Sequence, residues 1–137
     1  MLTTECLCTK LRRAARAVTK IYDDALAGVG LSAAQYSLLR HLQRLDLPSI
    51  SVLAEAMGLD RSTLGRNLKV LQADGLVDLA GGDDQRNRLV RLSGLGLARL
   101  TAGDKAWRSA QVQVGHYLGE DKRQALLVLL DDLEHLD

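Results

Sequence analysis

The segment from residue 61 to residue 69 combines basic and hydroxyl side chains at helical spacing. It contains three cations and no acid. If the leucines at 64, 68 and 71 face a core, the opposite helix face and its first turn carry a polar, basic set: Arg61, Ser62, Thr63, Arg66 and Lys69. Arginine suits the O6 and N7 atoms of guanine, while hydroxyls and backbone N–H groups suit phosphates. The alternative is an ordinary solvated helix face, which is common.

A second basic group lies in the polar stretch GGDDQRNR, residues 81 to 88. Arg86 and Arg88 could reach a minor groove beside the helix, because narrow A·T stretches attract arginine. Asp83 and Asp84 argue against simple attraction to phosphates, since they lie in the same stretch. We therefore expect Asp84 to hold Arg86 in position.

Two thiols, Cys6 and Cys8, are candidates for redox chemistry. Positions i and i+2 of a helix point to different sides, so a bond between the two would require the turn to unfold. Two thiols are too few for a closed zinc site, and the three histidines have no ligand-like spacing, so we expect no metal. The alternative is that both are ordinary near-terminal thiols, because reactivity depends on pKa and exposure.

Leucine periodicity and cap residues predict the elements that position these groups. Ser32 and Gln35 form a capping box, Gly58 makes a tight turn between two short helices, and Asp60 is an N-cap. The predicted order is helices at 5–27, from 32, at 49–58 and at 60–74, then a hairpin formed by LVDLA and LVRLS, then a helical region from 93 that is interrupted at 115 or 119.

Composition and charge distribution restrict the class of protein. Of 137 residues, 47% are apolar and 3% aromatic, and the single proline favours a mostly helical chain. The net charge is +1, yet residues 10–20 hold five cations and no acid, and residues 119–137 hold six acids and two cations. With no apolar run long enough for a span or a signal peptide, we expect a cytoplasmic protein that contacts no membrane. The apolar stripes of both terminal regions predict a homodimer.

The run DRSTLGRNLKVLQADGLVDLAGGDDQRNRLVRLSGLG, residues 60 to 96, resembles the winged helix of the MarR family of transcriptional regulators. The resemblance covers nearly the whole chain. It implies a mainly α fold, a winged helix-turn-helix with a two-stranded β-hairpin wing and terminal dimerisation helices. It also implies a single domain, residues 1–137, with dimerisation helices at 5–30 and 94–137 and the DNA-binding part at 31–93.

The same resemblance implies roles for the hairpin residues. Asp84-Gln85-Arg86 matches the Asp-x-Arg motif of the family's wing, in which the arginine enters the minor groove. Gly65 stands where a larger polar residue is usual, and Gln85 where arginine is frequent. These two departures leave the preferred DNA sequence open.

The stretch LCTKLRRAARAVTKIYDDAL, residues 7 to 26, is similar to the first helix of the family's organic-hydroperoxide-sensing branch. The similarity implies that Cys8 is the reactive cysteine and Tyr22 a supporting tyrosine, whereas Arg12 and Ala33 replace two other supporting tyrosines. Arg12, one turn after Cys8, would favour the thiolate. We expect an effector pocket between the DNA-binding part and the dimerisation helices, with Tyr22, Arg12 and Tyr36.

These features predict a transcriptional regulator, most simply a dimeric repressor that thiol oxidation releases from a pseudo-palindromic stretch of double-stranded DNA. An alternative is release by a small aromatic ligand, with inert cysteines. Alternatives from other classes are a thiol redox enzyme and a helical dimerisation adaptor. Because no histidine or acid pair is placed to serve Cys8 and no G-x-G-x-x-G motif follows a strand, we expect no enzyme, no catalytic residue and no cofactor.

Overall fold

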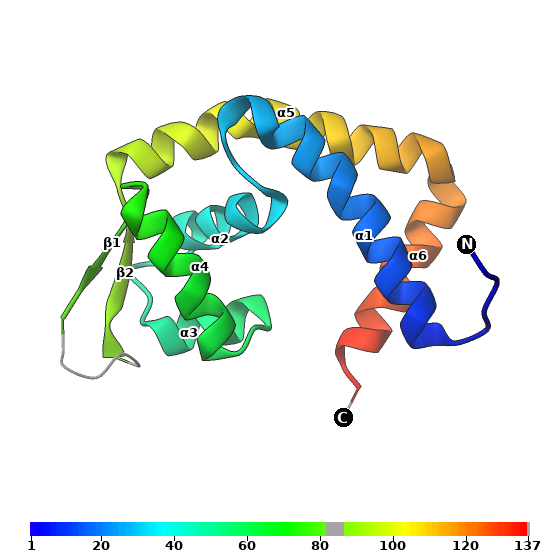
Figure 1. Ribbon diagram of the computed structural model, residues 1–137, viewed down its shortest axis with the longest axis horizontal. Helices are drawn as coiled ribbons and strands as arrows, with labels where there is room; N and C mark the ends of the chain where they lie inside the picture. The colour runs from blue at the N-terminus through cyan, green and yellow to red at the C-terminus, as the bar shows by residue number, and fades with distance from the viewer. Residues whose placement is uncertain (82–86, 137) are drawn as a thin grey trace.

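The computed structural model describes residues 1–81 and 87–136. Its elements, in chain order, are α1 (Leu7–Leu26), a short 3-10 helix (Ala27–Val29), α2 (Ala33–Arg44), α3 (Ile50–Met57), α4 (Arg61–Ala73), β1 (Val77–Ala80), β2 (Leu89–Leu92), α5 (Gly94–Leu118) and α6 (Glu120–Glu134). They form an arch (Figure 1). Helix α5 runs along the top, α2, α3, α4 and the strands form one limb, and α1 and α6 form the other. We call the limb with the strands the winged lobe.

Leucine side chains build the core of the winged lobe. In α4, Leu64, Leu68 and Leu71 are almost fully buried, because steps of three and four residues place them on one helix face. They belong to one cluster with residues of α2, α3 and both strands: Leu38, Leu39, Leu42, Leu53, Ala54, Val77 and Val90. Burying each large aliphatic side chain contributes roughly 1.5–3 kcal/mol, so this cluster fixes the relative positions of α3 and α4.

The turn between α3 and α4 depends on Gly58. Its φ of 66° lies in the left-handed region, and its N–H donates to the carbonyls of Ala54 and Glu55, which closes α3. Glycine adopts this conformation without the steric cost that a side chain brings. Helix α4 then begins after the N-cap Asp60.

The β-hairpin is anchored to the start of α3. Strands β1 and β2 pair antiparallel, with Val77 opposite Leu92 and Ala80 opposite Leu89. The N–H of Ile50 donates to the carbonyl of Arg88 at 3.0 Å, and the N–H of Val90 donates to that of Pro48 at 2.8 Å. The segment before α3 therefore extends the pairing of β2, and the base of the wing cannot move independently of α3.

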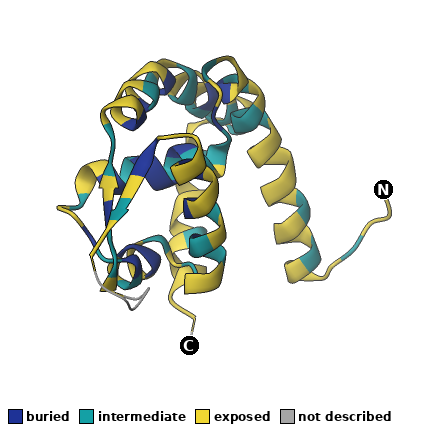
Figure 2. Cartoon of the chain, turned by 60° about the vertical axis from the view of Figure 1, so that its left-hand side comes forward, coloured by how far each residue is buried: buried dark blue, intermediate teal, exposed yellow. Residues whose placement is uncertain are grey.

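The terminal helices present far more apolar surface than the winged lobe. Helix α1 packs against α5, where Gly103 allows close approach: a Cβ there would lie 3.3 Å from side-chain atoms of Leu26 and Tyr36. Every residue of α6 is at least partly exposed. Figure 2 accordingly shows the buried residues concentrated around the winged lobe, with α1 largely exposed.

The predicted fold class is confirmed: the described elements are mainly helical, with one two-stranded antiparallel sheet. The capping box at Ser32 and the N-cap at Asp60 are both present. The first helix is shorter than predicted, because Cys6 is its N-cap and a 3-10 helix begins at Ala27. Of the two predicted interruptions, Gly119, with φ 82°, separates α5 from α6, whereas residue 115 lies within α5.

No helix within residues 1–81 and 87–136 is long and apolar enough to cross a membrane.

Candidate DNA-binding surface and effector cavity

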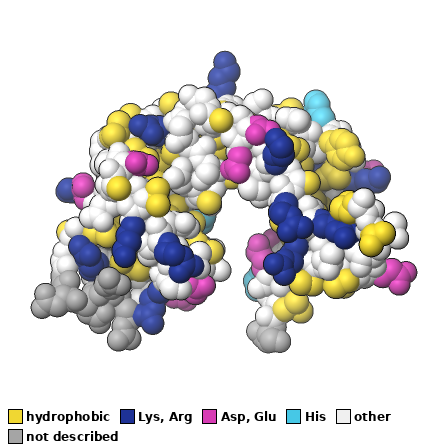
Figure 3. Space-filling model, in the orientation of Figure 1, with side chains coloured by type: hydrophobic (Ala, Val, Ile, Leu, Met, Phe, Trp, Pro, Cys, Tyr) yellow, Lys and Arg dark blue, Asp and Glu magenta, His cyan; other side chains and the backbone are white. Residues whose placement is uncertain are grey.

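The outer face of α4 carries the basic residues that the sequence singled out. Arg66 and Lys69 are exposed on the face opposite the buried leucines, and Arg61 is exposed on the first turn of the helix. Figure 3 shows Lys and Arg side chains on the lower part of the winged lobe and on the limb that contains α1. Helix α4 therefore exposes cations to solvent, while its leucines are buried in the core.

Asp60 organises the first turn of α4. Its carboxylate accepts the N–H of Thr63 at 2.7 Å, the hydroxyl of Ser62 at 2.7 Å and the hydroxyl of Thr63 at 3.0 Å. These hydrogen bonds, led by that of the Thr63 N–H, lower the pKa of Asp60 to about 2. The guanidinium of Arg66 donates to the Thr63 hydroxyl at 3.3 Å. A continuous chain of hydrogen bonds thus joins Asp60 to Arg66.

The wing residues are only partly within the described part of the chain. Asp84 and Arg86 lie outside the described residues, whereas Arg88 is half-buried where the chain enters β2. Sequence reasoning missed Arg91, whose guanidinium lies 3.3 Å from the carboxylate of Asp78 directly across the hairpin. Both residues alternate with apolar neighbours along their strands, so this alternation, together with the hairpin register, was the signal that could have found the pair.

A cavity of about 230 Å³ lies where α1, α2 and α5 meet. Aromatic rings and cations dominate its lining: Tyr22, Leu26, Ala33, Tyr36, Ser37, Arg40, His41, Arg44 and Trp107. Tyr22 and Tyr36, both predicted for an effector pocket, are thus brought together, whereas the exposed Arg12 is not among the lining residues. Arg40, Arg44 and Trp107 were missed, because only the tertiary fold brings α2 and α5 side by side.

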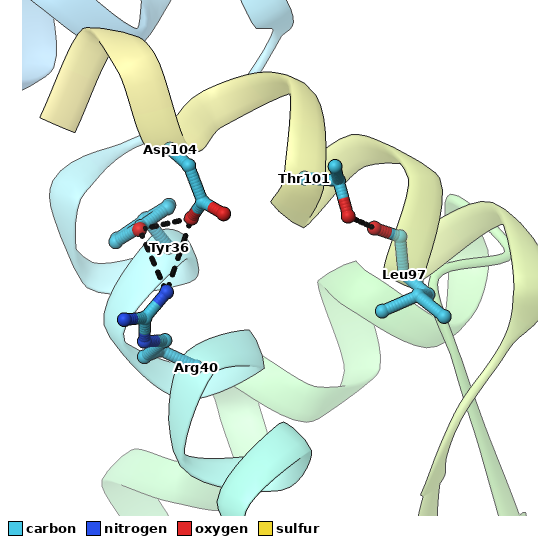
Figure 4. A network of polar contacts seen from close by, with 5 residues as sticks. All are labelled: Tyr36, Arg40, Leu97, Thr101 and Asp104. Atoms are coloured by element: carbon cyan, nitrogen blue, oxygen red, sulfur yellow. Dashed lines mark hydrogen bonds and ion pairs between the residues drawn. The ribbon is translucent and has the colours of Figure 1, made fainter.

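A polar network links the cavity to α5 (Figure 4). The hydroxyl of Tyr36 donates to Asp104 at 2.6 Å, and Arg40 donates to the same carboxylate oxygen at 3.1 Å. Burial and the bond to Asp104 together raise the pKa of Tyr36 to about 12. The Tyr36 ring stacks on Trp107 with centroids 6.1 Å apart, and the Arg40 guanidinium lies 6.0 Å from the Trp107 ring centroid. One aromatic–cationic cluster therefore couples α2 to α5.

Tyr22, which lines the cavity, also links α1 to α5. Its hydroxyl donates to the side-chain oxygen of Gln111 on α5. Burial raises the pKa of Tyr22, although the nearby Arg123 opposes this rise. Tyr22 and Cys8 are separated by fourteen positions of α1, which is about 21 Å along a helix. Within one protomer, Tyr22 therefore does not support the Cys8 thiol.

Both cysteines are accessible to a reagent. Cys6 and Cys8 are exposed and unbridged, at the N-cap and second position of α1. Hydrogen bonding from the Thr9 hydroxyl, followed by that from its backbone, lowers the pKa of Cys6. A lower pKa increases the thiolate fraction, and the thiolate is the nucleophile.

Comparison with known proteins places this geometry in a family. A sequence model of the MarR family matches residues 29–87, which include α2, α3, α4 and β1. The crystal structure of the M. tuberculosis transcriptional regulator MosR is 33% identical, with a TM-score of 0.80, and covers 96% of this chain and 98% of its own. The chain belongs to the MarR family. It is therefore a DNA-binding transcriptional regulator and not an enzyme.

Other MarR-like structures share the whole arch. CouR, a transcriptional repressor solved on a 23-mer DNA duplex, is 27% identical, with a TM-score of 0.82 over 94% of this chain and 92% of its own. CouR bound to p-coumaroyl-CoA is 25% identical, with a TM-score of 0.87 over 97% of this chain and 94% of its own. MosR has also been solved in complex with DNA. Among curated protein sequences, none matches this chain significantly.

Proposed function

We propose that this MarR-family regulator is a dimeric repressor that reads a pseudo-palindromic operator with α4 and the wing. The observation that carries the proposal is the exposed basic face of α4, directly opposite its buried leucines. The α4 side chains assigned to DNA are Arg61, Ser62, Thr63, Arg66 and Lys69, and those of the wing are Asp84, Arg86 and Arg88. Two copies related by a twofold axis would contact half-sites about 34–36 Å apart.

The dimer in this proposal forms through the limb of α1 and α6 together with α5. An apolar hollow of about 740 Å³ lies between these helices, lined by residues that include Val18, Ile21, Val114 and Leu126. Leu7, Leu127 and Val128 on the same limb are also exposed. A second copy would bury these surfaces, which accords with dimerisation helices at 5–30 and 94–137 and a DNA-binding part at 31–93.

The experiment that tests DNA reading is selection of duplexes from a randomised library by the purified full-length chain. We expect enrichment of related half-sites in inverted repeat, and an affinity that falls with salt because cations on α4 displace counterions from phosphates. Binding that shows no preference among duplexes at any salt concentration would contradict the function.

The release signal in this proposal is oxidation of the thiols at the start of α1. Resemblance to the hydroperoxide-sensing branch favours Cys8, and the lowered pKa favours Cys6. An organic hydroperoxide would oxidise the thiolate to a sulfenic acid and be reduced to the alcohol. Condensation of the sulfenic acid with a small thiol, with loss of water, would give a mixed disulfide that adds bulk beside the dimerisation helices. The test is DNA binding by wild type, Cys6→Ser, Cys8→Ser and the double variant with an organic hydroperoxide and a small thiol, and then with reductant. The sensing thiol is the one whose serine variant keeps DNA; release from both single variants and from the double variant excludes thiol sensing.

The cavity favours a second release signal, an aromatic acid. Its volume of about 230 Å³ exceeds the ~150 Å³ that suffices for benzene. Three aromatic rings could sandwich a ring, and Arg40, His41 and Arg44 could hold a carboxylate. Calorimetry with hydroxycinnamate and its uncharged amide tests this: we expect heat from the acid only, and loss of that heat in Arg44→Gln. Equal binding of acid and amide would exclude the charge assignment.

A further inference from the structure

We infer that Asp60 is a positioning residue that makes the hydroxyls on the first turn of α4 hydrogen-bond acceptors. This turn would then select bases that present an amine in the major groove. This inference rests on the proposed DNA-reading function. Sequence reasoning assigned the Ser62 and Thr63 hydroxyls to phosphates. Their hydrogen bonds in the structure point to a different role.

Both hydroxyl protons of the first turn are already used. An ionised carboxylate has no proton to donate, so in each pair with Asp60 the hydroxyl must be the donor. A serine or threonine hydroxyl has one proton and two lone pairs. While Asp60 holds these protons, Ser62 and Thr63 can meet DNA only as acceptors. A phosphate oxygen is itself an acceptor, so neither hydroxyl can bond to it.

The acceptors of this turn match one class of base edge. In the major groove, hydrogen-bond donors are the N4 amine of cytosine and the N6 amine of adenine. Asp60 Oδ1 already accepts two of these hydrogen bonds and Oδ2 accepts one, so the carboxylate adds one further acceptor site, on Oδ2, at the same turn. The carboxylate stays ionised at any physiological pH, since its pKa is about 2. The turn is therefore complementary to cytosine or adenine and unfavourable for a guanine or thymine carbonyl.

The same chain of bonds orients Arg66. Thr63 donates to Asp60 and, through a lone pair, accepts the Arg66 guanidinium at 3.3 Å. One donor of Arg66 is thereby held, and the remaining donors are available to the O6 and N7 atoms of guanine. Because Arg66 is partly ordered before it meets DNA, it loses less conformational entropy on binding. Asp60 thus places the acceptors that would contact an amine-bearing base next to the arginine that would contact guanine, once in each half-site.

The test uses full-length wild type and Asp60→Asn on a duplex selected by the wild type. Asparagine is an equally good N-cap, so α4 keeps its start, but its amide cannot accept both hydroxyl protons. In a second duplex, the amine-bearing base is replaced by an analogue without the amine, purine for adenine or 2-pyrimidinone for cytosine. In wild type we expect the analogue to weaken binding on the order of 5- to 10-fold. In Asp60→Asn the same replacement should change affinity less than twofold.

The matched control is Asp74→Asn, which removes a carboxylate at the other end of α4, where Asp74 is the C-cap. It should keep the wild-type response to the analogue.

Thr63→Val retains the Asp60 cap through the backbone N–H of residue 63 but breaks the link to Arg66. It should reduce discrimination at the guanine position. An equal analogue effect in wild type and Asp60→Asn, or unchanged guanine discrimination in Thr63→Val, overturns the inference. If wild type selects no duplex at all, the DNA-reading function itself fails.

Discussion

The cationic side chains of α4 differ in how firmly hydrogen bonds orient them. Arg66 is hydrogen-bonded to Thr63, whereas Lys69 and Arg61, the latter on the first turn, are exposed cations. A held arginine suits base reading, because bidentate contact with guanine needs a fixed orientation, while flexible cations suit phosphates. The two kinds of residue should therefore respond differently to mutation.

Arg66→Ala should weaken specific binding and relax preference at one base pair per half-site, at a cost of about 1–3 kcal/mol. Lys69→Ala should weaken binding to all sequences alike and reduce the salt dependence. Competition binding with single-base operator variants, repeated over a salt series, separates the two effects. Lys105→Ala, on the exposed surface of α5, is the control and should bind like wild type. A uniform loss in Arg66→Ala would mean that it contacts phosphate instead of a base.

Thr9→Ala should slow the alkylation of Cys6 at neutral pH. The hydroxyl of Thr9 is the largest cause of the lowered Cys6 pKa, so its removal raises the pKa and reduces the thiolate fraction. Timed iodoacetamide labelling, followed by mass spectrometry of the peptide that contains residue 6, measures the rate. Thr19→Ala, at an exposed position on the same helix, is the control. Equal rates in the three proteins would remove Thr9 as the cause.

At the scale of elements, close contacts on α5 fix the winged lobe relative to the terminal helices. Gly96 lies against the turn between α4 and β1, where a Cβ would come within 2.1 Å of the Leu76 carbonyl oxygen. Farther along α5, Asp104 joins Tyr36 and Arg40 of α2. These two contacts lie about two turns apart on α5 and join it to the α4–β1 turn and to α2.

Gly96→Ala should destabilise the fold by about 1–3 kcal/mol or more, because α5 must shift away from a backbone carbonyl that cannot yield. Gly65→Ala is the matched control, since among the described residues the added Cβ meets no atom within 4 Å apart from its chain neighbours and the nearby backbone of α4. That change should instead stabilise α4 by roughly 0.5–1 kcal/mol. Urea unfolding followed by circular dichroism measures both. A neutral effect of Gly96→Ala would show that the α4–α5 contact is not tight in solution.

The contact of α2 with α5 should weaken at high pH. The pKa of Tyr36 is raised in the folded chain to about 12 from an ordinary 10.0. Because the pKa of Tyr36 is higher in the folded chain than in the unfolded one, its contribution to the free energy of unfolding is complete below pH ~10. That contribution is lost as the pH rises from ~10 through ~12. Tyr36→Phe, which cannot ionise, should lose less stability over this range than wild type. Thermal unfolding at graded pH tests this, and an equal loss of stability in the two proteins would contradict the prediction.

At the scale of the whole molecule, the two limbs of the arch differ in how completely a single chain buries their apolar side chains. The winged lobe has a closed core, whereas α1 and α6 leave large apolar side chains in water. Exposed apolar area of this extent marks an interaction surface. In the proposed dimer, a second copy of the chain would bury these side chains and would provide the twofold symmetry that a pseudo-palindromic operator requires.

Leu126→Lys should convert the dimer to a monomer and abolish cooperative operator binding, because the change puts a charge into the apolar hollow between α1, α5 and α6. Sedimentation equilibrium should give twice 14.9 kDa for wild type and 14.9 kDa for the variant. Val52→Lys, at a similarly exposed apolar position on α3, should stay dimeric. A wild-type chain of 14.9 kDa at micromolar concentration would contradict both the dimer and the twofold reading of DNA.

The sequence by itself determined the elements and the face of α4 that meets solvent. Leucine spacing, the Ser32 capping box, the Asp60 N-cap and Gly58 act over a few residues, so their effects can be read from local order. Thiol exposure, the bond partners of Ser62 and Thr63, and the cavity depend on side-chain rotamers and on helices distant in sequence. Only the tertiary structure brings Arg40, Trp107 and Asp104 together, because no pattern in the chain encodes how α2 crosses α5.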